Sequence, residues 1–365
     1  MGVLTLREPG PRVRFAERGA FSRDLDTAAK VYFEGAESRR DVLRMYLKSV
    51  IILTWFFGSW ALLVFGARNM WEGALCAVSL GLAIAGVGMS VQHDANHGAT
   101  SKYGVVNRAF GATLDMMGVS SFIWRPKHNI AHHTFTNVEG VDFDLDFGSL
   151  ARLSPSQSHR PWHRYQHFYL WFFYGFLLPK WVFFDDFVVL RTQLIGIHKL
   201  PRLDRRGLAG FVGWKVFFVA WSMVIPALYH PIWQVLVFHL IAVFTLGWTL
   251  GTIFQLAHCV READFPLPVA DRVDDDFAMH QLATTVDFGA DNGLLTWFAG
   301  GLNYQVEHHL FPKVCHIHYP GLAKVVAKVA LAHGLEHRRQ ATFGGALASH
   351  FLHLRNLGRP TAASE

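Results

Sequence analysis

Residues 232–258 read IWQVLVFHLIAVFTLGWTLGTIFQLAH, an apolar stretch without Asp, Glu, Lys or Arg that ends at His258. A helix needs about 20 predominantly apolar residues to cross the hydrocarbon core of a bilayer. We therefore predict a transmembrane helix over residues 232–257, with His258 where the helix meets the membrane boundary. The composition agrees, since 51% of the 365 residues are hydrophobic and only 17% are charged.

Three further stretches are similarly long and apolar, and the only charged residue within them is Lys215. Residues 49–67 and 73–91 are separated by a short link, and residues 208–229 are separated from the fourth stretch only by His230 and Pro231. Short links of this kind join antiparallel helices. The sequence thus predicts an all-α membrane protein with four transmembrane helices in two hairpins, with spans at residues 49–67, 73–91, 208–229 and 232–257.

The distribution of Lys and Arg predicts the orientation. These residues are frequent before the first span and between the hairpins, and nearly missing from both hairpin turns. The positive-inside rule then places both termini and residues 93–207 in the cytoplasm. We predict a single domain over residues 1–365, made of the four spans, a cytoplasmic N-terminal segment at 1–40, and a helical cytoplasmic cap at 93–207 and 258–350.

Residues 164–190 are aromatic and apolar, but Pro179-Lys180 and Asp185-Asp186 interrupt them. We interpret them as helices that lie in the membrane interface, with a fifth span as the alternative. The formal charge of +6 is explained by residues that flank the spans, and no nucleic-acid recognition motif accompanies it.

Histidine is the unusual residue type, with 21 copies that fall into tight groups. Three scattered cysteines form no C-x-x-C pair, so a bound metal has to use nitrogen or oxygen ligands. HDANH at residues 93–97 and HNIAHH at 128–133 each place two histidines four residues apart, on one helix face. QVEHH at 305–309 and the single histidine after the fourth span complete the set of candidates: His93, His97, His128, His132, His133, His258, His308 and His309.

Eight imidazoles need two metal ions, because one ion rarely takes more than six ligands. The adjacent pairs His132-His133 and His308-His309 suit this arrangement, since neighbours point to different sides. His239 lies about 28 Å along the helix from His258 and is interpreted as structural. A role as ligand or neighbouring group stays open for His159, His163, His167, His316 and His318.

HDANH, HNIAHH and QVEHH resemble the three histidine boxes of the integral-membrane fatty acyl desaturases, and the match extends from about residue 40 to 330. The resemblance implies a di-iron, non-haem centre held by the eight histidines, with no catalytic residue beyond the metal ligands. It also implies O2 as co-substrate and, because no haem-binding H-P-G-G is found, an external electron donor of the ferredoxin or cytochrome b5 type with its reductase.

The glutamine that opens the third box is similar to the front-end and linoleoyl branch, which adds a double bond between an existing one and the carboxyl end. Gln305 occupies the place of a ligand histidine in other branches, so it is either a ligand or a group that orients one. Asp94 and Glu307 are expected to orient ligands from within the boxes. Asp287 stands where relatives often have Asn.

The predicted function is O2-dependent desaturation of a fatty acyl chain carried by CoA, a carrier protein or a membrane lipid. The alternatives are a di-iron acetylenase or hydroxylase with the same boxes and a non-enzymatic metal-binding membrane protein. Asp142, Asp144 and Asp146 are interpreted as a solvated loop. Trp124-Arg125 and Lys127 are candidates for contact with the phosphate of an acyl carrier or with lipid headgroups.

Overall fold

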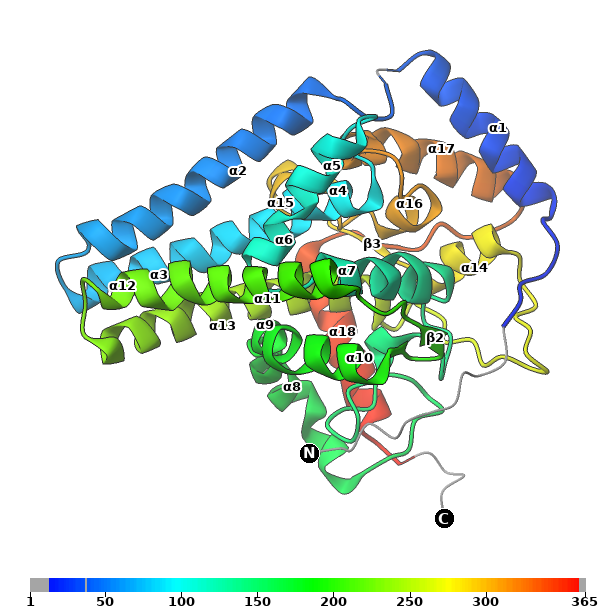
Figure 1. Ribbon diagram of the computed structural model, residues 1–365. Helices are drawn as coiled ribbons and strands as arrows, with labels where there is room; N and C mark the ends of the chain where they lie inside the picture. The colour runs from blue at the N-terminus through cyan, green and yellow to red at the C-terminus, as the bar shows by residue number, and fades with distance from the viewer. Residues whose placement is uncertain (1–12, 37, 361–365) are drawn as a thin grey trace.

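The four apolar stretches form long helices that pair into two hairpins, and both hairpin turns lie at the same end of the molecule (Figure 1). The computed structural model describes residues 13–36 and 38–360; residues 1–12 and 37 of the predicted N-terminal segment lie outside the described part. Within the described residues, four helices are long and apolar enough to cross a membrane: Leu43–Gly66, Met70–His97, Arg205–Ala227 and Ile232–His258.

The prediction of an all-α membrane protein with two hairpins is thereby confirmed. The segment at 164–190 contains no fifth helix of spanning length among the described residues. The first hairpin consists of α2 (Leu43–Ala61), which continues through a π-helical turn at Leu62–Gly66, and α3 (Met70–Gly86), which continues through Val87–Gln92 into α4 (His93–His97). The second consists of α11 (Arg205–Val219), a π-helical turn at Ala220–Val224, α12 (Ile225–Ala227) and α13 (Ile232–His258).

Local chemistry explains where these helices begin. The Asn69 side chain accepts hydrogen bonds from the backbone of Trp71 and Glu72 and caps α3, and Asp204 caps α11 through Gly207. Both are favourable N-cap residues because they satisfy backbone N–H groups that have no partner within the helix. The first histidine box continues the second span directly, so the helix geometry itself places His93 and His97 at the end of this span.

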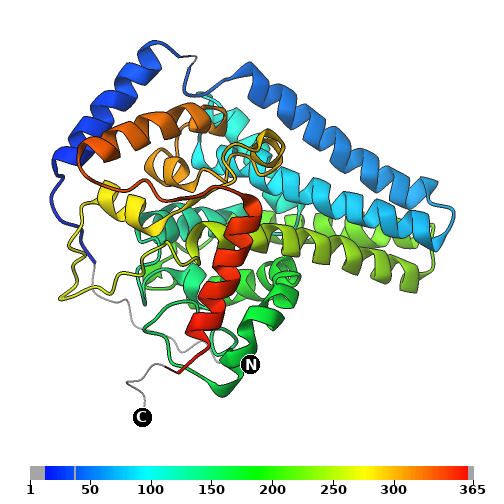
Figure 2. The same cartoon turned by 180° about the vertical axis from the view of Figure 1, so that it is seen from behind.

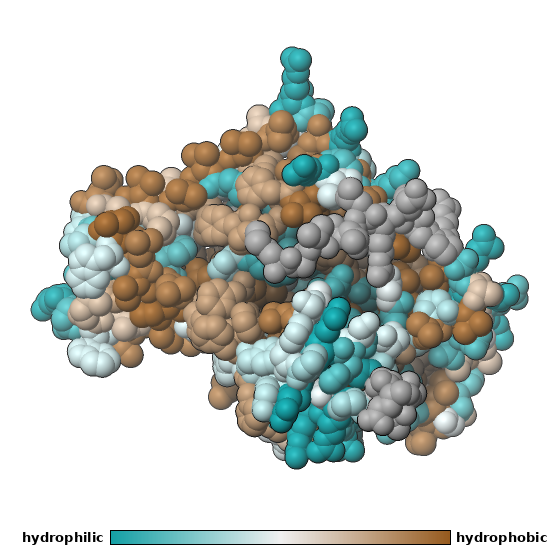
Figure 3. Space-filling model, turned by 90° about the horizontal axis from the view of Figure 1, so that it is seen from below, coloured by the Kyte–Doolittle hydropathy of each residue, from teal (hydrophilic) through white to brown (hydrophobic). Residues whose placement is uncertain are grey.

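The two hairpins pack through α3 and α13. A Cβ atom on Gly81 would lie 2.5 Å from the carbonyl oxygen of Ala242, so only glycine permits this approach of the two backbones. Small residues at such crossings are typical of helix pairs in membranes. The other two spans bury little of their surface: 28% of the most apolar part of Leu43–Gly66 and 11% of that of Arg205–Ala227 are buried. The outer surface of the projecting helical hairpins is largely apolar (Figure 3).

The remaining elements form the cap at the opposite end from the hairpin turns. Seen from behind, α1 lies along α17, and α18 lies beside α8 (Figure 2). The helices of this part are α1 (Ala20–Glu34), α5 (Gly104–Gly111), α6 (Thr113–Met116), α7 (Ser121–Arg125), α8 (Gln166–Tyr174), α9 (Leu177–Lys180), α10 (Asp186–Thr192), α14 (Phe277–Thr284), α15 (Gly293–Phe298), α16 (Gln305–Leu310), α17 (Tyr319–Ala332) and α18 (Phe343–Leu357).

Shorter turns and strands complete the cap. They are π-helical turns at Pro126–His132 and Trp181–Asp185, 3-10 turns at Phe143–Leu145, Pro161–Tyr165 and His316–His318, an antiparallel pair β1 (Leu194–Ile195) and β2 (His198–Lys199), and a parallel pair β3 (Asp287–Phe288) and β4 (Arg339–Gln340). The parallel pair joins the segment before the third histidine box to the segment after α17.

A partly buried ion pair fixes the 164–190 segment to the four long apolar helices, which together form the anchor. Lys215, the single charged residue within the apolar part of α11, places Nζ 2.7 Å from the carboxylate of Asp186 and also donates to the carbonyl oxygens of Gly118 and Val182. A charge inside a membrane span needs such partners. The pair therefore holds α10 and the preceding turn against the third span.

Candidate metal centre

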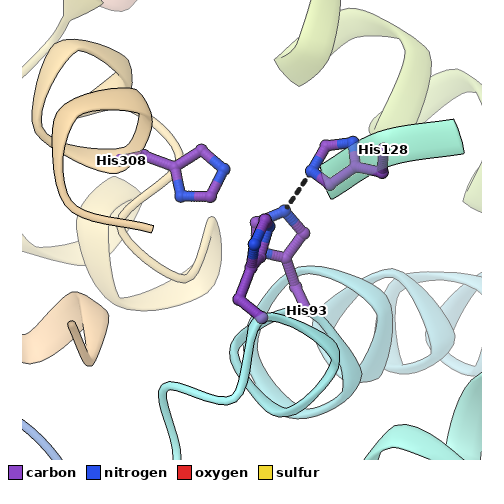
Figure 4. A group of neighbouring side chains, drawn as sticks. His93, His128 and His308 are labelled. Carbon is purple, nitrogen blue, oxygen red and sulfur yellow. Dashed lines mark hydrogen bonds between the residues drawn. The ribbon is translucent and has the colours of Figure 1, made fainter. Parts of the chain in front are cut away.

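The four groups of histidines meet at one end of the helical anchor. His93 and His97 lie at the end of the second span, and His258 is the last residue of α13. The second box lies on the π-helical turn Pro126–His132, and the third lies on α16. In Figure 4 the rings of His93, His128 and His308 approach one another from three separate segments. The structure thus brings together all eight histidines that the sequence singles out.

One set of ligand atoms comes from His93, His97, His128 and His308, with one ring nitrogen of each within 4.8 Å of the others. The Nε2 atoms of His93 and His128 are 3.1 Å apart. Two imidazole nitrogens bound to one ion at about 2.1 Å, as in zinc sites, lie about 3.0–3.4 Å from each other. The spacing therefore suits a shared transition-metal ion.

A second set comes from His132, His258 and His309, whose ligand atoms also lie within 4.8 Å of one another. Their ring centroids are separated by 4.7 to 5.1 Å. His133 belongs with His308 and His309 in a third overlapping set and stacks on the ring of His309. The neighbours His308 and His309 thus face different sets, which is the geometry expected of adjacent ligands that serve two ions.

Burial and unpaired nitrogen atoms indicate that the donor set fits a metal. Seven of the eight rings are buried and His128 is half-buried. Buried polar atoms are nearly always hydrogen-bonded, yet six of these rings keep one nitrogen without a hydrogen-bond partner among the described residues: His93 Nδ1, His97 Nε2, His133 Nδ1, His258 Nδ1, His308 Nε2 and His309 Nε2. A cation bound to the cluster would supply partners to rings of this kind.

Burial also keeps most of these rings neutral. It lowers the pKa of His128, His133, His308 and His309 well below the usual value, and the neighbouring histidines lower it further. Neutral imidazole is the form that binds metal. His132 differs, because burial lowers its pKa while the nearby carboxylates of Asp142 and Asp144 raise it more, and the net pKa is raised.

Three rings are oriented by partners that the sequence analysis did not identify. Nδ1 of His132 lies 3.0 Å from the Asp142 carboxylate. Nδ1 of His309 lies 2.9 Å from Oε1 of the Gln281 side chain, and Nδ1 of His308 lies 3.1 Å from the Tyr319 hydroxyl. In each ring this contact leaves Nε2 for the cluster. Such partners fix the tautomer and the direction of a ligand histidine.

The interpretation of residues 142–146 as a solvated loop was wrong for Asp142, whereas the side chain of Asp144 is partly exposed and Asp146 is exposed. Asp142 is buried and contacts His132, and Asp144 forms an ion pair of 3.0 Å with Lys127. The loop folds back because Asp142 also accepts hydrogen bonds from the backbone of Asn137 and Asp144. No spacing in the sequence indicated this turn.

The basic residues ahead of the second box have partners inside the protein. Lys127 is paired with Asp144, and Nε of Arg125 donates to Asn96 at 2.8 Å. Trp124 is buried and stacks on His128 with ring centroids 4.3 Å apart. These three residues thus lie against the histidine cluster, and the contact with a carrier phosphate stays an untested prediction.

The two carboxylates within the boxes have other partners than the eight histidines. Asp94 lies 2.9 Å from Nδ1 of His316, whose Nε2 is 2.8 Å from Nζ of Lys48. Glu307 lies 3.2 Å from Nε2 of His337, a residue that belongs to none of the histidine groups in the sequence. Burial and the neighbouring Asp287 raise the pKa of Glu307 to about 8. Burial alone would lower the pKa of His337, but its contacts with the two acids raise it to about 10.

Gln305, the third residue named with the boxes, is buried, and its side-chain oxygen has no hydrogen-bond partner among the described residues. It lines the cavity that contains the cluster. The other histidines lie elsewhere. His159 and His163 contact backbone carbonyls of Gly358 and Ser149, His167 packs on Phe168 and Phe351, His318 contacts the Ser38 carbonyl, and His239 lies in α13 near Phe218.

The cluster opens into a cavity with ≈ 1040 Å³ of empty space, including its solvent-open part. Its lining contains five of the ligand histidines, Gln305 and charged side chains such as Lys127, Lys180 and Asp144, together with many apolar and aromatic side chains. Those apolar and aromatic side chains are Trp124, Phe143, Leu145, Phe147, Tyr174, Leu177, Trp181, Phe254 and Leu302. A polar metal cluster therefore faces a space suited to an apolar chain.

Two further cavities continue from this space into the anchor. One of ≈ 370 Å³ shares Trp124, Trp181 and Phe254 with the cluster cavity and reaches Leu246. The next, of ≈ 650 Å³, borders it at Ile84, Met117 and Leu178. The three cavities follow one another along α13, and the walls of the inner two are almost entirely apolar.

Comparison with known proteins agrees with this arrangement. The family model for fatty acid desaturases matches residues 69–341. The sn-1 linoleoyl-lipid 6-desaturase of Arthrospira platensis is 38% identical over 349 residues, which cover 95% of each chain. The protein of the same name from Synechocystis sp. is 37% identical over 95% of this chain and 98% of its own. An acyl-lipid (8-3)-desaturase of Physcomitrium patens is 36% identical over 86% of this chain and 66% of its own.

Proposed function

This chain belongs to the fatty acid desaturase family and is a membrane oxidoreductase that desaturates fatty acyl chains, and from that premise we propose that its eight clustered histidines hold two non-haem irons. Its relatives support an activity of the front-end type. The observation that carries the metal assignment is the presence of two sets of closely spaced imidazoles, linked through His133, His308 and His309. Six of these rings keep a nitrogen without a hydrogen-bond partner among the described residues.

The irons, when bound, supply with O2 and two electrons the oxidising power needed to remove hydrogen from an unactivated methylene. His93, His97, His128 and His308 would hold one ion, and His132, His258 and His309 the other, with His133 between them. Asp142, Gln281 and Tyr319 hold three of these rings in their binding direction. The unpaired oxygen of Gln305 supports a role as a further ligand or as an acceptor for a group bound at the cluster.

The apolar walls orient the substrate and exclude water. An acyl chain in the cluster cavity would pass between the histidines and Tyr174, Leu177 and Phe254. Beyond Phe254, the inner cavities follow α13 back to Val235, a length of about 28 Å along a helix. This length is more than sufficient for the methyl-terminal half of an extended fatty acyl chain.

We propose a membrane lipid as the acyl carrier and linoleoyl chains as the substrate, with the new double bond at carbon 6, by similarity to the two 6-desaturases. The electrons would come from a separate ferredoxin- or cytochrome b5-like protein with its reductase. We also propose a cytoplasmic active site and cytoplasmic termini, because the Lys- and Arg-rich segments lie at the same end of the spans as the cluster.

Expression in a host whose lipids contain linoleoyl chains tests the proposed substrate. We expect part of the linoleate to gain one double bond at carbon 6, while a His309→Ala variant present at the same membrane level yields none. Mass spectrometry of derivatives that mark double bonds gives the position. Unchanged unsaturation with iron, O2 and reductant supplied would overturn the assignment, and a gain of oxygen would identify hydroxylation instead.

A side chain placed in the inner cavity should change the preferred chain length. Gly88 lines this cavity, and a Cβ there would lie 3.7 Å from Leu250, in ordinary contact. Gly88→Leu would therefore occupy space proposed for the methyl end. We expect the ratio of products from chains two carbons shorter to those from the normal chain to rise by about tenfold or more, since each methylene in an apolar pocket contributes about 1–3 kcal/mol.

The matched control for Gly88→Leu is Gly210→Leu. Gly210 lies on the exposed surface of α11, and a Cβ there meets no atom within 4 Å. The product ratio of this variant should equal that of the unaltered protein in a competition assay with both chain lengths. An equal ratio in the Gly88 variant would show that the methyl end lies elsewhere.

A further inference from the structure

A second group of buried titratable side chains lies beside the third histidine box. Asp287 and Glu307 are 1% and 0% exposed, and both carboxylates approach the same ring nitrogen. Nε2 of His337 lies 3.1 Å from Asp287 and 3.2 Å from Glu307. An isolated buried carboxylate is costly, and the His337 ring is the partner that the structure places opposite both acids.

Asp287 connects this ring to the metal-binding helix. Its Oδ1 accepts a hydrogen bond of 3.0 Å from the backbone N–H of Val306, in the first turn of α16. That turn carries Gln305, and the same short helix carries His308 and His309. The carboxylate therefore holds the third box with one oxygen while the other faces His337.

The backbone around His337 is held independently of its ring. The N–H of Asp287 donates to the carbonyl of Arg338, and β3 pairs with β4 in parallel register. The Arg338 side chain reaches a separate site, where it donates to the carbonyls of Glu262 and Ala283 and pairs with Asp264 at 2.9 Å. The segment can thus stay in place when the His337 ring is removed.

We propose that His337 is a positioning residue of the metal centre, which acts through Asp287 to fix the backbone that presents Gln305, His308 and His309. The inference rests on the proposed metal centre and extends it by a residue more than 25 positions beyond the third box in sequence. It also accounts for the acid at 287: a carboxylate at this place requires a cation opposite, whereas an amide would not.

Metal titration of purified protein in detergent tests this proposal, because it measures metal binding and does not depend on catalytic activity. The samples are stripped of metal and titrated with Co²⁺, whose visible absorption reports binding and ligand geometry. His337→Gln should weaken Co²⁺ binding by about 10-fold or more, the range found for partners that orient metal ligands, and should alter the spectrum at saturation. The thermal unfolding midpoint of each metal-free sample is measured alongside.

Two companion variants separate positioning from general stability. Asp287→Asn combined with His337→Gln removes the acid through which His337 is proposed to act and keeps an oxygen for the Val306 N–H. Co²⁺ affinity should therefore return to within about 3-fold of the unaltered protein, a strong departure from additivity. Arg338→Gln removes side-chain contacts of the same segment that do not involve the third histidine box. It should leave the Co²⁺ affinity and the spectrum unchanged.

Each outcome has a distinct meaning. If the unaltered protein binds no Co²⁺ or Fe²⁺, the proposed metal centre fails, and the role of His337 fails with it. If the unaltered protein binds metal and His337→Gln binds it equally well, only the positioning role is overturned. An Arg338→Gln variant as weak as His337→Gln, or a double variant without recovery, would likewise contradict the action through Asp287.

Discussion

Replacement of His132 by alanine should abolish desaturation and remove iron from the set formed by His132, His258 and His309. The ring contributes a proposed ligand and also carries the contact of its Nδ1 with Asp142 at 3.0 Å. Its loss should exceed the roughly 10- to 100-fold effect that is typical of changes to groups around a metal ligand. Product formation in membranes and iron content per purified chain measure the two effects.

The set around His93, His97, His128 and His308 does not include this ring, so part of the iron should remain in the His132 variant. His333→Ala is the matched control, since this ring is partly exposed at the end of α17 and pairs with Asp24. It should keep full activity and full iron content. An active His132→Ala variant with unchanged iron would remove His132 from the proposed centre.

The eight candidate ligands could be predicted from sequence because short motifs and the ends of the spans identify them. Histidines four residues apart share a helix face, and the alternation of spans and loops predicts that all the boxes meet at one end of the anchor. His93 and His97 satisfy both conditions most directly, since the box continues the second span without a break. The helix count follows from composition in the same way.

The groups that orient the ligands could not be predicted, because only contacts between segments that are distant in sequence identify them. The segments of Gln281 and Tyr319 lack the spacing of a histidine box, and both residues reach their histidines only through tertiary packing. Asp142 lies in an acidic run that is typical of solvent-exposed loops, and only the folded turn places it against His132. His337 is likewise identified only by its contact with two buried acids.

The apolar route into the anchor is a third feature beyond sequence reasoning. Its walls come from both hairpins and from the 164–190 segment, and the residues that border neighbouring cavities, such as Phe254 and Leu178, belong to different segments. Hydropathy predicts that these residues are buried or face lipid, but it contains no information about the space left between them. The depth of substrate binding therefore depends on how closely the helices pack.

That packing should fail when Gly247 is changed to alanine. A Cβ at this position would lie 2.7 Å from the carbonyl oxygens of both Tyr174 and Gly175, and backbone atoms cannot move aside as a flexible side chain can. The end of α8 would have to shift away from α13. We expect destabilisation of about 1–3 kcal/mol, the usual cost of overpacking, measured as a lower thermal unfolding midpoint in detergent.

The same shift should lower activity, because Tyr174 lines the cluster cavity and its hydroxyl is held by His350 at 2.7 Å. Gly213→Ala provides the comparison: this glycine lies on the exposed face of α11 with no atom within 4 Å of an added Cβ, and alanine there gains up to about 1 kcal/mol of helix propensity. Two alanine variants with equal midpoints and equal activities would show that α8 and α13 do not approach as closely as these distances require.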